Sequence, residues 1–279
     1  YCASWVRFDL DIHDHIWIES LSLYGCTDIS SAAVITDDGS CNGSDARIVN
    51  RYPSYDELDG VHNILLAYNG MPPEFDKDGV GRFSVDDMLP YLAYIKDGKM
   101  QDTFFDSVLF LPFARYTCST LYKTADGWKY YLDNTFSEGE NVDAVDKAAK
   151  IVSDELGVEH NVKIFLPIFH TKPTYGEFPD SFGDIDGDGI EENLDDLKTC
   201  KKDTKWFIDA HIARFAEKER KNVTLAGFYW HEESIQYNRP NEMEILLYAS
   251  EYVHSLGYKF IWIPYYQAWG YDNWKANGF

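Results

Sequence analysis

The sequence has few basic residues and no long apolar run. Its 279 residues include 25 Lys and Arg against 47 Asp and Glu, a formal net charge of -22. A surface of this sign repels polyanions, so we expect neither nucleic acid nor an anionic membrane surface as a partner. We also expect no membrane span, because no run of about 18 apolar residues occurs. A neutral polymer is compatible with this charge.

Signals for nucleotide and zinc binding are also missing. No GxGxxG or GxxxxGK[ST] loop follows any apolar segment, which removes the main support for nucleotide binding. The five cysteines show no CxxC or Cys/His spacing, and one is left over under any full pairing. A disulfide between Cys26 and Cys41 stays open. The start at Tyr1, which is neither an initiator Met nor a signal peptide, indicates a mature or excised piece.

The first part of the chain has the pattern of antiparallel strands. Trp5–Leu10 and Ile16–Tyr24 alternate polar and apolar residues and are followed by Asp-, Gly- and Ser-rich turns. Such alternation is typical of strands with one buried face. The W-x-x-x-D-L form of the first segment is similar to a strand of jelly-roll modules of the discoidin kind. We therefore predict the C-terminal part of a discoidin-like β-sandwich module over residues 1–58.

From His62 onward, continuous apolar segments alternate with amphipathic helices, the pattern of buried parallel strands and the helices that cover them. The acidic run Asp76–Asp87 is interpreted as a solvated loop. We predict strands at 63–68, 107–113, 162–169, 225–230 and 259–264. We predict helices at 141–157, 205–221 and 241–257, with Asn141 capping the first and an Asn241–Glu244 capping box starting the last.

This βαβα order leaves two large α/β architectures, an open doubly wound sheet or a closed barrel. The missing phosphate loop and the aromatic residues at strand ends favour the barrel. We predict an α/β fold in which residues 59–279 form a (β/α)8 TIM-type barrel domain. Only five strands are visible, so we expect the barrel to be truncated after strand five, with its C-terminal strands missing.

The most specific motif is an acidic loop that matches a twelve-residue calcium loop. Oxygen ligands stand at its first, third and fifth positions, Gly187 provides the sharp turn, and a carboxylate closes it. We predict a structural Ca²⁺, and the alternative is a solvated Asp/Gly turn that binds nothing. The predicted metal ligands are Asp184, Asp186, Asp188, the carbonyl of Ile190, and Asp195.

A second motif is an apolar strand, Gly227–Trp230, that ends in His231, Glu232 and Glu233. Strand ends supply the catalytic groups of a barrel, and glycoside hydrolysis needs a pair of carboxylic residues. A carboxyl beside aromatic rings is partly desolvated, which raises its pKa and lets it hold a proton. We predict that Glu232 or Glu233 is a general acid. The alternative is two solvated acids near a helix start.

Aromatic and polar residues gather at the same predicted strand ends. Sugar rings present CH faces that stack on aromatic planes, so a cleft lined in this way suits a carbohydrate. For each residue a structural role is an equal alternative. The predicted substrate-binding residues are Tyr68, Asn69, Arg115, His170, Trp230, His231, Tyr265, Tyr266 and Trp269.

Several short segments carry a resemblance to a known family: Asp59–Gly60, Leu65–Gly70, Leu109–Pro112, Gly227–Trp230 with Glu233, and Ile263–Tyr266. Through them, the sequence from about residue 60 to 279 resembles the bacterial domain of unknown function 4855 family, a group of secreted proteins considered similar to TIM-barrel glycoside hydrolases. The resemblance implies a barrel whose fourth strand ends in the acid/base glutamate, a place that Glu233 matches better than Glu232.

Together these features predict a secreted or cell-surface glycoside hydrolase that cleaves a polysaccharide or oligosaccharide by carboxylate acid/base catalysis. The alternative is a noncatalytic carbohydrate-binding or cell-surface module on a barrel scaffold. Lyase or esterase chemistry is only partly excluded by the absence of a GxSxG motif.

Overall fold

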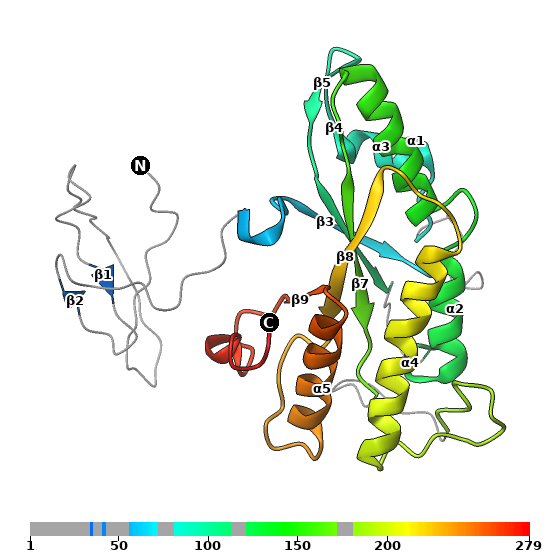
Figure 1. Ribbon diagram of the computed structural model, residues 1–279, viewed down its shortest axis with the longest axis vertical. Helices are drawn as coiled ribbons and strands as arrows, with labels where there is room; N and C mark the ends of the chain where they lie inside the picture. The colour runs from blue at the N-terminus through cyan, green and yellow to red at the C-terminus, as the bar shows by residue number, and fades with distance from the viewer. Residues whose placement is uncertain (1–33, 36–40, 43–55, 72–80, 113–120, 172–180) are drawn as a thin grey trace. The chain divides into compact units, whose positions relative to one another are not determined.

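The computed structural model describes residues 34–35, 41–42, 56–71, 81–112, 121–171 and 181–279 (Figure 1). The chain divides into two compact units, Tyr1–Ser54 and Tyr55–Phe279. In the first unit, β1 (Val34–Ile35) pairs antiparallel with β2 (Cys41–Asn42). The other residues of the predicted sandwich module up to residue 55 lie outside the described residues.

The second unit is built on a five-stranded parallel sheet with the order β3-β6-β7-β8-β9. All five strands predicted from the apolar runs are confirmed, and with them the α/β class. Neighbours in the sheet follow the chain order, without the reversal of a doubly wound sheet. Closure into an eight-stranded barrel stays a prediction. The strands are β3 (Ile64–Asn69), β6 (Ser107–Pro112), β7 (Val162–Ile168), β8 (Val223–Trp230) and β9 (Lys259–Trp262).

Helices lie between these strands in the chain. The first and third pack together beside an antiparallel hairpin, β4 (Ala93–Lys96) and β5 (Lys99–Thr103), at one end of the unit (Figure 1). The fourth and fifth pack against each other. The α-helices are α1 (Val85–Leu92), α2 (Ala125–Thr135), α3 (Val142–Leu156), α4 (Leu197–Ala216) and α5 (Glu242–Ser255). Short 3₁₀ turns occur at η2 (Asp56–Leu58), η3 (Leu121–Lys123) and η4 (Tyr271–Asn273).

Two predicted helix caps are wrong, because neither asparagine caps its helix. Asn141 precedes α3 but does not cap it, because its Oδ1 accepts the Phe83 N–H at 3.1 Å instead of a helix N–H. Asn241 precedes α5 at φ 66° and makes no side-chain cap hydrogen bond, so the capping box with Glu244 is absent. Both asparagines occupy a backbone conformation with positive φ instead, which asparagine tolerates better than most residues.

Two further predictions about helices are wrong in their extent. The run ending at Asp87 is not only loop, because Ser84 and Asp87 form a reciprocal capping box that starts α1. Helix α4 begins at Leu197, eight positions before the predicted residue 205, because the Asp196 carboxylate accepts the Thr199 N–H at 3.0 Å and caps it.

The two faces of the sheet differ in their cover. Along β6, Val108 and Phe110 belong to the large core under the helices, whereas Leu109 and Leu111 belong to a smaller cluster on the opposite face. This smaller cluster includes Tyr229 of β8. Successive residues of a strand point to opposite faces, so the parity of each position decides which face it reaches. We call the face of the smaller cluster the inner face.

Gly227 sets the close contact of β8 with β9. A Cβ atom at this position would lie 2.3 Å from the Lys259 carbonyl oxygen, so no larger residue fits. The register of β8 against β7 shifts at Ile164/Phe165, opposite this point. The glycine therefore lets β8 stay paired with β9 at the bulge. The residues after β8 reach the carboxyl edge of the sheet in a defined position.

Candidate functional site

The acid pair Glu232–Glu233 follows β8 at the carboxyl edge of the sheet. Its backbone is fixed by the segment after β9. The Trp262 indole N–H donates to the Glu232 carbonyl at 2.6 Å, and the Tyr265 N–H donates to the Glu233 carbonyl at 3.2 Å. Two bonds from a neighbouring strand connection thus hold the loop that carries both carboxylates.

The two acids differ in their surroundings. Glu232 is 8% exposed and buried, whereas Glu233 is an exposed residue. Partial desolvation of its carboxyl, and next the negative charge of Glu232, raise the pKa of Glu233. A carboxyl that is open to a ligand yet retains its proton to higher pH has the properties of a general acid. Of the two predicted acids, Glu233 has both properties.

Tyr229 belongs to this site, although it was expected only as a ring that desolvates the acid and not as a substrate-binding residue. It lies on the inner face and is 3% exposed. Burial raises its pKa well above the ordinary value, and the charges of Glu233, Tyr68 and Glu232 add to this effect. Tyr68, half exposed on β3, and Glu233 therefore lie within electrostatic reach of the Tyr229 hydroxyl. The alternation of β8 is the signal that would have found it, since Tyr229 points to the face opposite the buried Trp230.

His231 lies between Phe169 and Tyr229, with ring centroids 5.5 Å and 6.2 Å away. Burial lowers its pKa, and the charge of Glu232 opposes that shift. The imidazole therefore loses its proton at lower pH than an ordinary histidine does. Its ring packs against Tyr229, and it lies within electrostatic reach of Glu232.

Three other predicted contact residues lie on the helix side of the sheet. Trp230 is fully buried, with its ring centroid 5.5 Å from that of His170. His170 Nε2 lies 3.1 Å from a carboxylate oxygen of Glu242, and both side chains are 1% exposed. Asn69 is buried and donates to the Thr135 hydroxyl at 3.0 Å. These side chains pack on the helix-covered face of the sheet and do not join the acid pair. Arg115 lies outside the described residues.

The aromatic residues after β9 are exposed and tied to the acid loop. Tyr265, Tyr266 and Trp269 are 37%, 88% and 56% exposed. The Trp269 N–H donates to the Ser234 hydroxyl at 3.1 Å, and the Ile235 N–H donates to the Trp269 carbonyl at 3.1 Å. The structure therefore brings exposed rings and Glu233 together on connected backbone.

The predicted calcium loop gathers three of its ligands. Asp184, Asp186 and Asp188 each have a carboxylate oxygen within 4.8 Å of the others, and this exposed group could hold a metal ion. The Gly189 and Gly187 N–H groups each donate to Asp184 at 2.7 Å. The bond from Gly189 is the largest cause that lowers the pKa of Asp184. Backbone N–H groups thus hold this loop in a tight turn around the Asp184 carboxylate.

The remaining predicted ligands are placed differently. Asp195 is exposed and does not belong to the gathered group. Its N–H donates to the Asn193 side chain at 3.0 Å, and the next residue caps α4, so the chain has already turned away from the three aspartates. Ile190 is exposed, and its N–H donates to Asp188 at 2.8 Å.

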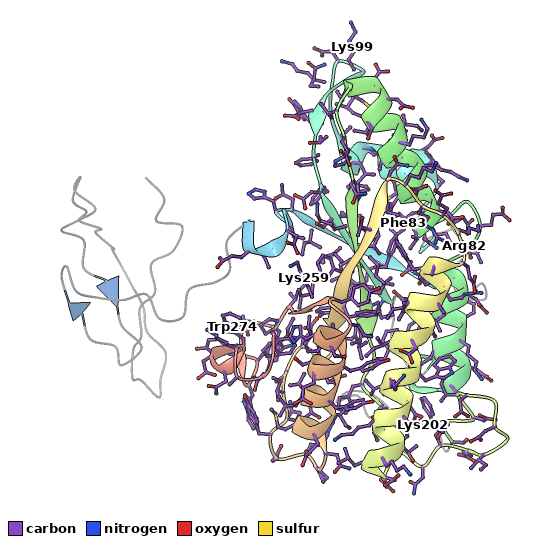
Figure 2. All side chains as sticks on the ribbon, viewed as in Figure 1. Arg82, Phe83, Lys99, Lys202, Lys259 and Trp274 are labelled. Atoms are coloured by element: carbon purple, nitrogen blue, oxygen red, sulfur yellow. The ribbon has the colours of Figure 1, made fainter. Side chains whose placement is uncertain are left out.

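Two further acids near the loop had no predicted role. The Lys202 ammonium group (labelled in Figure 2) lies 3.0 Å from an Asp186 oxygen and 2.8 Å from a Glu192 oxygen. Asp203 is fully buried, and neither of its carboxylate oxygens has a hydrogen-bond partner among the described residues. Burial, and next the charge of Glu192, raise the pKa of Asp203 to about 7.

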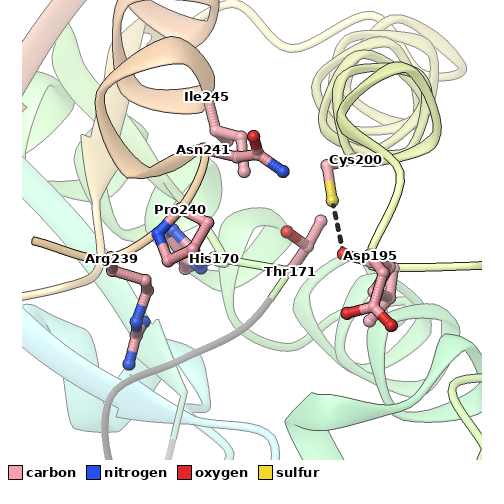
Figure 3. Close-up of a pocket in the computed structure, with 9 residues that line it drawn as sticks. His170, Thr171, Asp195, Cys200, Arg239, Pro240, Asn241 and Ile245 are labelled. Carbon is pink, nitrogen blue, oxygen red and sulfur yellow. Dashed lines mark hydrogen bonds between the residues drawn. The ribbon is translucent and has the colours of Figure 1, made fainter.

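A cavity of about 240 Å³ lies where the C-terminal end of β7 meets the starts of α4 and α5 (Figure 3). Neither Glu232 nor Glu233 lines this cavity. The loop 231–241 runs from the acid pair to the cavity wall. The lining residues are His170, Thr171, Leu194, Asp195, Cys200, Arg239, Pro240, Asn241 and Ile245.

The fold and site define an α/β domain with a parallel sheet and an acid pair at its carboxyl edge. Residues 63–279 match the model of the family described as Domain of unknown function (DUF4855), and the chain belongs to this family. Neither the comparison with curated proteins nor the comparison with solved structures gave a match. Among the described residues, no helix is both long and apolar enough to cross a bilayer.

Proposed function

We propose that this protein is a glycoside hydrolase-like enzyme in which Glu233 donates a proton to the leaving oxygen of a glycan. The observation that carries the proposal is the contrast between the two acids: Glu233 is accessible with a raised pKa, while Glu232 is buried beside it. A general acid works best when its pKa lies near the working pH. The charge of Glu232 moves the pKa of Glu233 in that direction.

The proposed substrate is a polysaccharide or oligosaccharide. Tyr68, Tyr265, Tyr266 and Trp269 offer exposed ring faces near the acid loop, and rings of this kind stack on the CH faces of sugars. The net charge of -22 favours a neutral polymer over an anionic one. An extracellular or cell-surface location is part of the same proposal, because a polymeric glycan does not enter the cell intact.

A barrel is the architecture that we propose for the complete domain. The sequential parallel order of the strands supports it, because right-handed crossovers in this order put the helices on one face. The inner face then becomes the barrel interior, where Leu109, Phe165 and Tyr229 already form a cluster. In such a barrel Glu233 follows the fourth strand at the catalytic edge.

We also propose that the three gathered aspartates bind Ca²⁺ as a structural ion. Hard carboxylate oxygens are its preferred ligands, and the Gly187 turn at φ 79° gives the loop its sharp bend. The ion would neutralise repulsion between Asp184, Asp186 and Asp188 and fix the connection before α4. It has no role in the proton transfer, because the ligands belong to a different connection from the acid pair.

A noncatalytic carbohydrate-binding module is the second candidate. The high exposure of Tyr266 and Trp269 favours it, because exposed rings bind sugars without any acid. It predicts glycan binding that does not depend on Glu233 and no turnover of any glycan.

The test is hydrolysis of a glycan panel by the full chain and by single variants. Glu233→Gln should lower the rate by about 10²- to 10⁴-fold with an unchanged Tm, because Gln keeps the shape but donates no proton of the required acidity. Glu251→Gln, an exposed acid on α5, is the matched control and should retain full rate. Equal rates for the Glu233 variant and the control would reject the proposal, and binding without turnover in the unaltered chain would establish the second candidate.

A further inference from the structure

The cavity between β7, α4 and α5 has the size of a small-molecule site. Its volume is about 240 Å³. Each water molecule takes up about 30 Å³ in the liquid, so the cavity has space for about eight waters or one six-membered ring with its substituents. The cavity therefore suits a single small unit.

Two polar side chains of the cavity wall are available to a ligand. Thr171 is 1% exposed, and its hydroxyl has no hydrogen-bond partner among the described residues. Asn241 precedes α5 without making a side-chain cap hydrogen bond. Figure 3 shows the Thr171 hydroxyl and the Asn241 amide turned toward the same space. A buried hydroxyl without a partner is energetically unfavourable, and a ligand hydroxyl would supply the missing hydrogen bond.

The charges around the cavity disfavour an ion as occupant. Glu242 lies 3.6 Å from the Arg239 guanidinium and 3.1 Å from the His170 imidazole, so the positive charge of Arg239 is already compensated. Asp195 adds a negative charge, which repels an anion. In the described part of the chain, the only cluster of metal-ligating side chains is Asp184, Asp186 and Asp188, so a cation has no set of ligands here.

The remaining chemistry is that of a neutral molecule with several hydroxyl groups. Asp195 accepts hydrogen bonds, Asn241 both donates and accepts, and Thr171 does both. Leu194, Pro240 and Ile245 supply apolar surface for CH groups. A sugar ring combines hydroxyl groups along its edge with CH groups on its faces.

We propose that this cavity is a binding site for one neutral saccharide unit, distinct from the acid pair at the end of β8. The choice of a saccharide rests on the proposed function, whereas the existence of the site rests on the cavity and its buried Thr171 hydroxyl. Arg239, Pro240 and Asn241 line the cavity, so an occupant contacts the far end of the loop that carries Glu233. The site thus serves as a secondary sugar site that supports the acid loop.

The experiment is an NMR titration of the full ¹⁵N-labelled chain with glucose, galactose, mannose, xylose and N-acetylglucosamine. At least one sugar should give saturable amide shifts at Thr171, Asn241 and Ile245. Thr171→Val should weaken its binding by about fivefold, the equivalent of one hydrogen bond, and Asn241→Gly should weaken it similarly. Thr171→Ser should bind as the unaltered chain does, because it keeps the hydroxyl.

Three controls test whether the binding is specific to this cavity. Thr224→Val changes an exposed threonine at the start of β8 and should leave binding unchanged. Thr171→Val should not lower the Tm in the absence of sugar, because its hydroxyl loses no hydrogen bond to the residues that the structure describes. Glu233→Gln should abolish hydrolysis yet keep the titration intact, so failure of catalysis is distinguishable from failure of this site. Absence of saturable shifts, shifts confined to other residues, or full affinity in both Thr171→Val and Asn241→Gly would overturn the inference.

Discussion

The second unit has two groups of carboxylates with opposite chemistry. Asp184, Asp186 and Asp188 gather on an exposed loop, where backbone N–H groups lower the pKa of Asp184. Glu232 and Glu233 follow a buried strand, where desolvation and like charge raise the pKa of Glu233. Asp184 keeps its negative charge, which suits a cation, and Glu233 keeps its proton to higher pH than an ordinary carboxyl does, which suits proton transfer.

The backbone conformation around each acid determines its role more than the number of acids in the group does. A glycine-rich turn exposes several N–H donors to a carboxylate and stabilises its charge. A strand end has used its N–H groups in the sheet, so an acid there has only neighbouring side chains and water. Asp203 is a third case, a fully buried acid. Neither of its carboxylate oxygens has a hydrogen-bond partner among the described residues.

The largest expected effect is on stability through Asp203. Its pKa is raised from 3.8 to about 7 in the folded protein, so the folded state holds an extra proton between these values. Stability therefore falls as the pH rises from about 4 to about 7 and then stays level. Asp203→Asn should remove this fall and stabilise the protein at pH 8 by about 2 to 4 kcal/mol.

Denaturant unfolding at pH 5 and pH 8 would measure this difference. Asp97→Asn, in the exposed turn between β4 and β5, is the matched control, because asparagine also tolerates its φ of 52°. The control should leave the pH dependence of unfolding as in the unaltered chain. If Asp203→Asn gives the same pH dependence as the unaltered chain, the buried carboxyl does not hold the extra proton.

The next effect is calcium binding by the exposed aspartates. An ion that binds only the folded state at about 100 times its Kd should raise the Tm by about 5 to 10 °C for a domain of this size. Asp184→Asn should abolish the rise, because Asp184 is one of the three gathered ligands. Thermal unfolding with Ca²⁺ and with a chelator would measure both.

Glu191 provides the matched control for this loop. It is exposed and lies between the gathered aspartates and Asp195, but it does not belong to the metal-ligating group. Glu191→Gln should therefore keep most of the stabilisation by Ca²⁺. An equal loss in both variants would mean that the ion responds to the general negative charge of the loop and not to a ligand set.

Much of the fold could be predicted because buried parallel strands have continuous apolar sequences, such as Val108–Leu111. Helix α1 was missed because Asp86, Asp87 and Pro90 give its segment the composition of a loop. The start of α4 was missed because its first turn is polar and only the Asp196 cap marks it. Caps that depend on backbone angles, as at Asn241, cannot be read from residue types alone.

The acid pair could be predicted from its place after an apolar strand, but its partners could not. Trp230 and Tyr229 are adjacent, and only the parity of the strand separates the buried Trp230 from the inner-face Tyr229. His170 was grouped with the strand-end residues, yet it faces Glu242, which lies 72 positions later in the chain. Contacts between residues so distant in sequence depend on how the helices pack.

The smallest expected effect concerns the pH dependence of the proposed reaction. A general acid acts only while protonated, so hydrolysis should decline as the pH rises through the raised pKa of Glu233. Glu232→Gln removes the adjacent negative charge, which lowers the pKa of Glu233 and moves this decline to lower pH. The maximal rate at acidic pH should change much less than in Glu233→Gln. Tyr229→Phe is the matched comparison, because it keeps the buried ring within electrostatic reach of Glu233 and does not change the charge near neutral pH. A decline at the same pH in Glu232→Gln and in the unaltered chain would show that burial alone tunes Glu233, and the like-charge part of the contrast with the aspartate loop would be wrong.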